Sequence, residues 1–589
     1  MNHQHRRTQV LISGAGPVGL AAAVELGLRG VECLVVEPRL QPTRSRPRAK
    51  TLNTRTLEHL RRWGLAERLR ALAPLPTWWS QDVSFCTTLL GPEITRFSGV
   101  LGLTDTGVSP ELGQQLPQYV LEEMLREVVA EIPSCTLLLG HRVSLLVDCG
   151  DAVEVQIETT SAADRETVVA QYVLGADGAR GIVREAIGAH YQGTQALRPN
   201  FGVVFRSEGL LDALPNPPAV QSWVVNDRTP AVMGPVDRLG TWWLIAFGVE
   251  QPRGDHDLQS LVRGAVGDVG PVEILSTDPW TARMELVDRC RAGRVFLIGD
   301  AAHLNPPFGG HGLNTGIGDA VDIGWKLAAC IHGWGGPALL DSYQDERRPL
   351  HQRVIDEAKA NMSVLSNDLH SAGLDEGGDQ GEQARNAAAV TIRETKTAEY
   401  FSLDLVLGHR YTGSPIISNS ARQDFEHPGR AGDWRGAAVP GVRVPHACTG
   451  PGESTLDLAG PGFAVLTSTP DLVEPLQREA EHRGIPLQVH QLDPELQSSV
   501  LGAEIVLLRP DQVVAWCGDL APDSGELLDL VTGALSVTEP CDETNVREQG
   551  RVHPDHHGGY PSPAAAHEPE HSTTTWDSGG TPAARPCAS

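Results

Sequence analysis

Short apolar runs alternate with amphipathic helical patterns along the first 190 residues, which predicts repeated βαβ units. Residues 195–288 are richer in β-forming residues and Trp, with runs at 201–205 and 241–247, and predict a mainly β domain. Part of 75–110 is expected to join it. A strand, a Gly-rich loop and long helices return over residues 290–365. The pattern therefore predicts an α/β domain, made of residues 1–190 and 290–365, that is interrupted by a β domain.

The remaining third of the chain divides into a linker, a small unit and a tail. A polar stretch at about 367–387 is interpreted as a linker. Two strand-like runs, 463–466 and 504–508, flank a helical segment at 471–484, so residues 400–540 predict a small α/β fold. Residues 541–589 have almost no aliphatic side chains to offset an ordering entropy of about 1–2 kcal/mol per residue. We expect this tail to be disordered.

Composition excludes several classes of protein. No run approaches the roughly 18–20 apolar residues of a membrane span, and the polar N-terminus is unlike a signal peptide, so we expect a cytoplasmic protein. The formal charge of −26 argues against nucleic acid as a partner. The ten cysteines form no Cys-x-x-Cys pair, which argues against zinc, iron–sulfur and dithiol sites, and we expect no metal.

The first candidate site is a glycine-rich loop between a strand at 10–13 and a helix at 20–28. Gly14 permits a tight turn, Gly16 lets the backbone approach a pyrophosphate, and Gly19 lets the helix pack closely on the strand. Glu37 ends the next strand, where a carboxylate can accept hydrogen bonds from a ribose 2′-hydroxyl. This spacing predicts a dinucleotide site, and it does not separate FAD from NAD.

A second motif favours FAD. The buried strand at 294–298 runs into Gly299 and Asp300, whose carboxylate can accept from ribitol hydroxyls. The loop after it is rich in Pro and Gly, so its backbone N–H groups suit the polar edge of an isoalloxazine. A plain NAD dehydrogenase has no use for this strand. The cofactor-binding candidates in this motif are Asp300, Pro307, Gly312, Leu313 and Asn314.

A third motif, in which a strand at 173–176 leads to Asp177 and Gly178, makes the combination specific. The three motifs together resemble the single-component flavoprotein aromatic hydroxylases with the p-hydroxybenzoate hydroxylase fold, over about residues 8–540. Within that family the similarity is greatest to the 2,4-dichlorophenol 6-monooxygenase and phenol hydroxylase branch. The resemblance implies a Rossmann-like FAD-binding domain, an inserted β substrate domain and a C-terminal thioredoxin-like domain.

The resemblance also assigns roles outside the three motifs. It implies that Arg48 contacts the FAD pyrophosphate and that Gln118 and Asp177 contact FAD. Gly181 stands where the family usually has Ser, which suggests a more flexible loop. The thioredoxin-like domain lacks a Cys pair, so its implied role is packing or oligomerisation, which is compatible with a homodimer.

The implied reaction uses NADPH or NADH to reduce FAD, and O₂ then forms a flavin C4a-hydroperoxide that hydroxylates an electron-rich ring. The substrate is expected to be a small, phenol-like aromatic molecule. An unperturbed phenol has a pKa near 10, so ionising it at neutral pH needs a base or a nearby positive charge. Lys50 is a catalytic candidate for stabilising the phenolate, with a solvated lysine as the alternative, and Pro307 is a second catalytic candidate.

Substrate contacts are predicted by position alone. Core packing is the alternative for each of these β-domain residues, which are Trp223, Met233, Trp242, Trp243 and Arg283. Hydroxylation or Baeyer–Villiger oxygenation of a larger polyketide or antibiotic-type molecule remains an alternative function. A flavin-dependent halogenase would carry a Trp-x-Trp-x-Ile-Pro segment, which the sequence lacks. A flavin-binding protein without activity is the last alternative.

Overall fold

The computed structural model describes residues 6–45, 50–161, 164–194, 199–249, 252, 254–364, 368–418 and 438–534. Its first layer is a largely parallel sheet in the order β18-β19-β10-β1-β2-β7, extended by β8 and β9 beside β10. Its strands are β1 (Arg6–Ser13), β2 (Cys33–Glu37), β7 (Cys135–Leu139), β8 (His141–Asp148), β9 (Val153–Thr159), β10 (Arg165–Gly175), β18 (Arg291–Ala292) and β19 (Val295–Leu297). The predicted Rossmann-like domain is therefore present.

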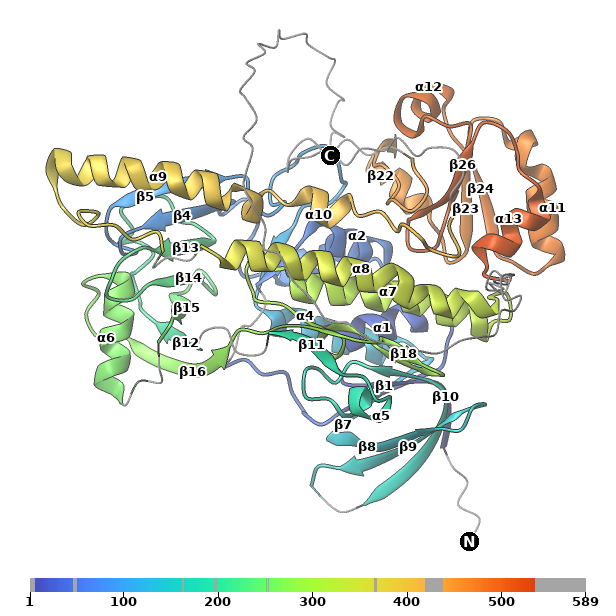
Figure 1. The fold of residues 1–589 in the computed structure, drawn as a ribbon, viewed down its shortest axis with the longest axis horizontal. Coiled ribbons are helices and arrows are strands. Elements are labelled where there is room, and N and C mark those ends of the chain that lie inside the picture. The colour runs from blue at the N-terminus through green and yellow to red at the C-terminus, as the bar shows by residue number, and fades with distance from the viewer. Residues whose placement is uncertain are drawn as a thin grey trace, which may run out of the picture.

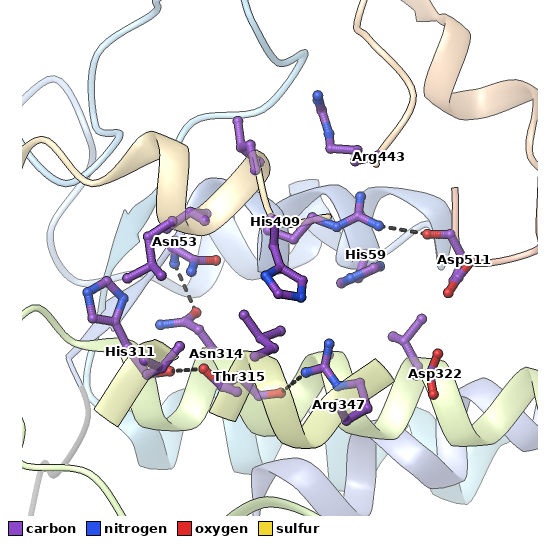
Figure 2. Close-up of a pocket in the computed structure, with 18 of the residues that line it drawn as sticks. Asn53, His59, His311, Asn314, Thr315, Asp322, Arg347, His409, Arg443 and Asp511 are labelled. Atoms are coloured by element: carbon purple, nitrogen blue, oxygen red, sulfur yellow. Dashed lines mark hydrogen bonds between the residues drawn. The ribbon is translucent and has the colours of Figure 1, made fainter. Parts of the chain in front are cut away.

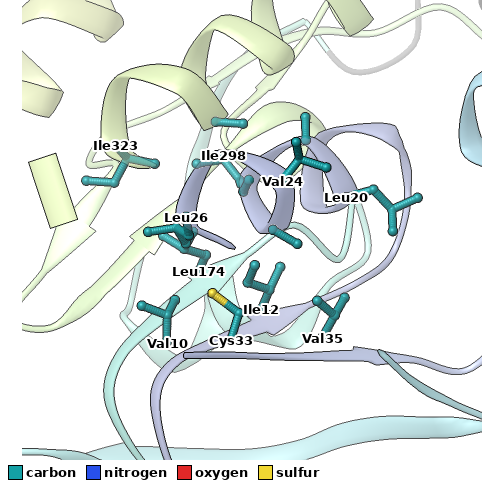
Figure 3. Close-up of a cluster of buried hydrophobic side chains, with 14 of the residues drawn as sticks. Val10, Ile12, Leu20, Val24, Leu26, Cys33, Val35, Leu174, Ile298 and Ile323 are labelled. Atoms are coloured by element: carbon teal, nitrogen blue, oxygen red, sulfur yellow. The ribbon is translucent and has the colours of Figure 1, made fainter. Parts of the chain in front are cut away.

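Helices cover this sheet because its central strands are apolar on both faces. β1 carries Val10, Leu11 and Ile12, all without solvent exposure. Val10 and Ile12 lie beneath α1 in a continuous core (Figure 3). The helices of this domain are α1 (Pro17–Gly27), α2 (Thr54–Arg62), α3 (Ala66–Leu72), α4 (Gln118–Glu131), α5 (Ile182–Ala186), α7 (His311–Ile331) and α8 (Pro337–Met362). α7 and α8 run side by side across the molecule (Figure 1).

The inserted sheet has the order β16-β12-β15-β14-β13-β4-β5, so a segment near residue 90 joins strands from after residue 199. α6 (Asp255–Val266) packs on one face of this sheet. The strands are β4 (Asp82–Cys86), β5 (Glu93–Ser98), β12 (Pro199–Arg206), β13 (Gln221–Val224), β14 (Ala231–Pro235), β15 (Thr241–Phe247) and β16 (Glu273–Thr281). A separate sheet, β11 (Tyr191–Thr194), β17 (Met284–Val287) and β20 (His303–Leu304), connects this region to the first domain.

The linker prediction for about 367–387 is wrong in its second half, because α9 (Gly378–Tyr400) begins there. Ala388, Ala389 and Ile392 are buried against the inserted sheet, on the face opposite α6. Gln, Glu, Ala and Arg at the start of α9 are good helix formers, so their polarity marks the solvent side of a helix rather than a loop. α9 lies along this sheet at the left of Figure 1.

The C-terminal unit is a four-stranded sheet in the order β24-β23-β25-β26. β23 and β24 are parallel and joined by α11, whereas β25 and β26 are antiparallel and precede α13, which is the predicted thioredoxin-like arrangement. The elements are β23 (Phe463–Thr467), α11 (Glu474–His482), β24 (Leu487–Gln491), β25 (Ile505–Leu508), β26 (Val514–Gly518) and α13 (Ser524–Val531). The predicted disordered tail, 541–589, lies outside the described residues.

The described helices were also compared with the requirements of a lipid bilayer. Crossing it takes about 20 predominantly apolar residues in one helix. Within the described ranges, no helix meets that requirement.

Candidate functional site: a cofactor cleft and its aromatic wall

The three sequence motifs meet at one edge of the parallel sheet. The registers pair Ser13 with Val36, Ser13 with Gly175, and Gly175 with Leu297, so these strands end level with one another. The residues that follow them carry the three motifs. Because the carboxyl ends of parallel strands are where open α/β sheets bind ligands, this edge is the candidate cofactor cleft.

Each glycine of the first loop has the surroundings that its proposed role requires. A Cβ on Gly14, whose φ is +105°, would lie 2.5 Å from the carbonyl oxygen of Ala176, and one on Gly19 would lie 2.0 Å from that of Gly14. A Cβ on Gly16 would meet no atom within 4 Å. No side chain caps α1, and its first turn holds no acidic residue. Gly14 and Gly19 are thus packed, while Gly16 opens a cradle at a helix N-terminus, which fits a pyrophosphate.

Glu37 lies buried at the end of β2, beside this loop. Its Oε2 accepts a hydrogen bond from the Ala15 amide at 2.8 Å, and its Oε1 accepts from the Arg39 amide and side chain at 3.0 and 2.7 Å. The carboxylate is thereby fixed beside the first loop, and its contact with a ribose stays a prediction. Gln118 begins α4 and donates to Glu122 at 2.7 Å. Arg48 lies outside the described residues, so its contact with the pyrophosphate stays a prediction.

Asp300 is exposed in the short 3₁₀ helix Gly299–Ala301, directly after β19. A buried carboxylate from α7 holds the start of this turn, since Asp319 Oδ2 accepts from the Gly299 amide at 3.0 Å and from His303 Nε2 at 2.9 Å. Its Oδ1 accepts from Arg347 at 2.8 Å and from His351 at 2.7 Å. Sequence reasoning missed this network, which orients the Asp300 turn.

The same network contains a group that could hold a metal ion. His303, Asp319 and His351 offer ligand atoms within 4.8 Å of one another, all buried. However, Asp319 also binds the Arg347 guanidinium, so a cation there would face a positive charge. Burial would raise the pKa of Asp319, yet His351 and Arg347 hold it well below its usual range. Burial lowers the pKa of His351 to about 4. The arrangement therefore fits an ionised carboxylate that orders the neutral His351 imidazole and accepts a hydrogen bond from His303.

The Gly-rich loop leads into α7, where no side chain caps the N-terminus. Pro307 is exposed, and a Cβ on Gly312 would meet nothing within 4 Å, so backbone N–H groups are open to a ligand. The Asn314 amide is already engaged, because it accepts from the Asn53 amide and Thr56 hydroxyl and donates to two carbonyls. Only the backbones of Leu313 and Asn314 can therefore serve an isoalloxazine.

Asp177 turns toward α5 and accepts a hydrogen bond from the Val183 amide at 3.2 Å. Burial raises the pKa of its carboxyl to about 6. A Cβ on Gly181 would lie 1.9 Å from Asp177 Oδ1. A larger residue here needs the Asp177 side chain to turn away, so Gly181 lets that carboxylate lie against the loop. A direct contact between Asp177 and FAD stays a prediction.

The candidate substrate residues fall on two faces of the inserted sheet, because side chains alternate along a strand. Trp223 and Trp243 pack on the α9 side with Phe308 of the Gly-rich loop. Met233 and Trp242 pack on the other side, beneath α6. Trp223 and Trp243 therefore lie on the face toward the Gly-rich loop, whereas Met233 and Trp242 lie on the opposite face, away from that loop.

We call Trp223, Trp243 and Phe308 the aromatic wall. Lys50 lies between this aromatic wall and the Gly-rich loop. It is half-buried, and its Nζ lies 4.0 Å from the centre of the Trp243 ring. Within the described ranges, no carboxylate forms an ion pair with it, and burial lowers the pKa of its ammonium group to about 7. The next residue, Thr51, lies against Gly310, with 3.3 Å between its Cβ and the position of a Cβ on that glycine. The geometry therefore places an amine of near-neutral pKa beside the loop.

Arg283 lies elsewhere, directly before β17 of the small sheet. Its guanidinium is 5.6 Å from the centre of the Tyr191 ring, and that of Arg184 is 4.6 Å from it. The Tyr191 hydroxyl donates to the Asp300 carbonyl at 2.5 Å. Arg283 also pairs with the buried Glu285. Two guanidinium groups therefore flank the outer side of the Asp300 turn.

A cavity of about 100 Å³ lies behind the first turns of α7, between α2, α8 and the C-terminal unit (Figure 2). His59, Arg347, Arg443 and Asp511 are among its lining residues. None of the loop glycines 14–19, Glu37 or Asp300 lines it. Since it is polar and large enough for several water molecules, we regard it as part of the domain junction and not of the cofactor cleft.

Comparison with known proteins gives family matches over most of the chain. A model described as "FAD binding domain" matches residues 7–358, and one described as "Aromatic-ring hydroxylase, C-terminal" matches residues 433–536. The chain is 30% identical to tetracenomycin B2 monooxygenase-dioxygenase of Streptomyces olivaceus, over 88% of this chain and 96% of that protein. It is 28% identical to 2,4-dichlorophenol 6-monooxygenase of Delftia acidovorans, over 86% and 94%.

A solved structure extends the similarity to the whole fold. The rebeccamycin biosynthetic enzyme RebC with reduced flavin superposes with a TM-score of 0.82 at 34% identity. The superposition covers 90% of this chain and 100% of that one.

Proposed function

This chain belongs to the FAD-dependent aromatic-ring hydroxylases, as its motifs predict, and from that premise we propose that it hydroxylates a phenol-like ring with NADPH or NADH as reductant. It is a flavoprotein monooxygenase with FAD as cofactor. The single observation that carries the choice of substrate is Lys50, an amine held on an aromatic face beside the cofactor loops.

Bound FAD supplies the activation of O₂. Gly16 and the first turn of α1 would hold its pyrophosphate, Glu37 its ribose, Asp300 its ribitol, and the backbone at Gly312 its pyrimidine edge. The aromatic wall of Trp223, Trp243 and Phe308 excludes water from the ring that is oxidised. The chain's own task is to orient the substrate and to handle its proton.

We assign that proton to Lys50 Nζ. Because the pKa of Lys50 is near 7, its amine is neutral in much of the protein at pH 8 and can accept the hydroxyl proton of a bound phenol. The product of this transfer is an ion pair of phenolate and ammonium, and the attraction between the two charges favours it where solvent is excluded. A phenolate ring is richer in electrons than a phenol ring, which suits attack by an electrophilic oxygen.

The nicotinamide cofactor is assigned to the outer side of the Asp300 turn. Arg184 and Arg283 present two guanidinium groups around Tyr191, and guanidinium groups bind phosphates in a bidentate manner. The position next to Asp300 would bring a docked pyrophosphate close to the flavin. Arg283 is thus proposed for reductant binding in place of the substrate role predicted from the sequence.

A second candidate function is oxygenation of a larger, fused-ring natural product. The observation that favours it is the similarity to tetracenomycin B2 monooxygenase-dioxygenase over 88% of this chain. Both candidates use the same flavin site. They differ in the size of the ring system that fits beside Trp243 and Lys50.

The experiment is NADPH and NADH consumption by the FAD-loaded protein with a panel of simple phenols and hydroxylated fused-ring aromatics. We expect at least one compound to accelerate consumption and to give a product that contains one more oxygen atom. Acceleration by fused-ring compounds alone would favour the second candidate. If no aromatic compound accelerates consumption, the proposed function is wrong.

A further inference from the structure

The cavity behind α7 has the features of a ligand site. Its volume of about 100 Å³ is enough for an ion together with several water molecules. α2, α7, α8 and the C-terminal unit all contribute to its lining, so a bound ligand would contact elements that are far apart in the sequence. Neither the cofactor nor the substrate assignments use this space.

One wall of the cavity carries a polar atom that the surrounding protein does not satisfy. His59 of α2 is buried, and within the described ranges its Nδ1 has no hydrogen-bond partner. The ring is stacked on that of Trp63, with 6.4 Å between the ring centres. Figure 2 shows His59 turned toward Arg347 and His409, which line the same cavity. Because buried polar atoms have partners as a rule, Nδ1 indicates a ligand or an ordered water molecule at this wall.

The electrostatic potential around His59 is positive. Arg55 and Arg443 line the cavity, and both pair with the same buried carboxylate, that of Glu58. Arg347 of α8 lines it as well. Burial and the neighbouring guanidinium groups hold the pKa of His59 well below its usual range. The imidazole is therefore neutral and can donate one N–H, while the guanidinium groups favour a ligand of negative charge.

Two carboxylates also line the cavity, but their charges are compensated from behind. Asp322 accepts from Lys326 at 2.8 Å and from Arg509 at 3.0 Å. Asp511 accepts from Arg509 through both of its oxygens, at 3.0 and 2.5 Å. Neither Lys326 nor Arg509 lines the cavity. These carboxylates thus need no cation inside it.

We propose that the cavity binds a small univalent anion, such as chloride, formate or acetate, between His59 and the guanidinium groups of Arg55 and Arg347. The anion joins α2 and α8 to the C-terminal unit, whose Arg443 lines the same cavity. This inference goes beyond the proposed function, because it concerns a second ligand at the domain junction and no step of the oxygenation.

The test compares melting temperatures of the FAD-loaded protein in sodium chloride and in sodium gluconate at equal ionic strength, without a nicotinamide cofactor. Gluconate carries the same charge, so screening is matched, but it is too large for a cavity of about 100 Å³. We expect chloride to raise the melting temperature by about 2 °C in a saturable manner. Formate and acetate are further arms that show which small anions the site accepts. Equal melting temperatures in all four salts would overturn the proposal.

His59→Phe identifies the part of this rise that belongs to the cavity. It removes the N–H donor and keeps a ring stacked on Trp63, so we expect the difference between chloride and gluconate to disappear. The matched control is His490→Phe, because His490 lies on β24 and does not line the cavity, and it should keep the difference. A His59→Phe variant that retains the full difference would contradict the site.

Bromide can replace chloride and be located directly in crystals of the parent protein by anomalous diffraction, which does not depend on the folding of any variant. We expect a bromide peak between His59 and Arg347. Bromide bound only elsewhere, with water alone in the cavity, would overturn the proposal.

Discussion

At the scale of single residues, Gly14, Gly16 and Gly19 of the first loop have different neighbours. Substitutions at these positions should therefore affect FAD binding and folding separately. Gly16→Ala places a methyl group in open space, so we expect normal folding but FAD binding weakened by at least about tenfold, since the methyl group would contact the pyrophosphate. Its matched control is Gly19→Ala, which would press on the Gly14 carbonyl and lower the melting temperature. Equal effects of the two variants on FAD binding and on melting would contradict these roles.

The pKa of Lys50 predicts how kcat/KM depends on pH. The free amine has a pKa of about 7, so kcat/KM for a phenol should rise with pH up to about 7 and then level off, because a neutral amine can take the substrate's proton. In Lys50→Arg the group stays charged and accepts no proton. Its kcat/KM should be lower near neutrality and continue to rise toward the phenol's own pKa near 10. A parent profile that falls above pH 7, or identical profiles for parent and Lys50→Arg, would exclude proton acceptance by Lys50.

The residue roles that the sequence predicts most directly are local ones. Gly14, Gly16, Gly19 and Glu37 lie within one βαβ unit, and a strand–loop–helix pattern determines their environment. The Asp319 network was missed because its members, which come from β20, α7 and α8, are brought together only by tertiary packing. Asn314 was predicted to bind FAD without a distinction between backbone and side chain, and only tertiary packing determines that its side chain joins α7 to the segment at Thr51 and Asn53.

At the scale of elements, the alternation of side chains along β15 predicts a strand with two faces, but it does not predict which face meets the cofactor. The run at 241–247 predicts a strand, and alternation places Trp242 and Trp243 on opposite faces, but no local signal says which face meets the cofactor. That choice depends on α6 and α9, which cover the two faces. The linker prediction failed for the same reason, since α9 is apolar only on the side that the sheet covers.

The two neighbouring tryptophans form a matched pair for a test. Trp242→Ala should leave a cavity beneath α6 and lower the free energy of unfolding by about 3–5 kcal/mol, without changing substrate affinity. Trp243→Ala should weaken substrate binding and raise the pKa seen in the pH profile, because water reaches Lys50. Urea unfolding and flavin absorbance titrations measure the two effects. If Trp242→Ala weakens substrate binding as much as Trp243→Ala does, the assignment of faces is wrong.

At the scale of the whole molecule, a buried charge network fastens the C-terminal unit to the flavin domain. Arg509 donates to Glu346 at 2.6 and 3.0 Å, to Asp322 at 3.0 Å and to Asp511 at 2.5 and 3.0 Å. Lys326 binds Asp322 and Glu346 at 2.8 Å each. Two positive groups thus face three carboxylates away from water, and burial raises the pKa of Asp322 to about 7.

Removing Arg509 should therefore loosen the junction. Arg509→Met leaves buried carboxylates without their partner, and we expect a loss of about 3–5 kcal/mol in the free energy of unfolding. The loss should shrink as pH falls through the acid range, because, against the effect of burial, Arg509 holds the pKa of Glu346 well below its usual range in the parent, and in the variant this carboxylate can take up a proton. The control Arg483→Met breaks partly exposed pairs and should change it by less than about 1 kcal/mol. Equal, pH-independent losses in both variants would contradict a structural role for the network.

The central claim is that this flavoprotein transfers one atom of O₂ to an aromatic ring. Its most direct test is a single reaction of the FAD-loaded protein with NADPH or NADH, an accepted aromatic substrate and oxygen-18 gas, followed by mass spectrometry of the product. The account predicts a product that carries one labelled oxygen atom for each nicotinamide oxidised. A product whose new oxygen comes from water, or nicotinamide oxidation that yields only hydrogen peroxide with every aromatic compound tried, would contradict it.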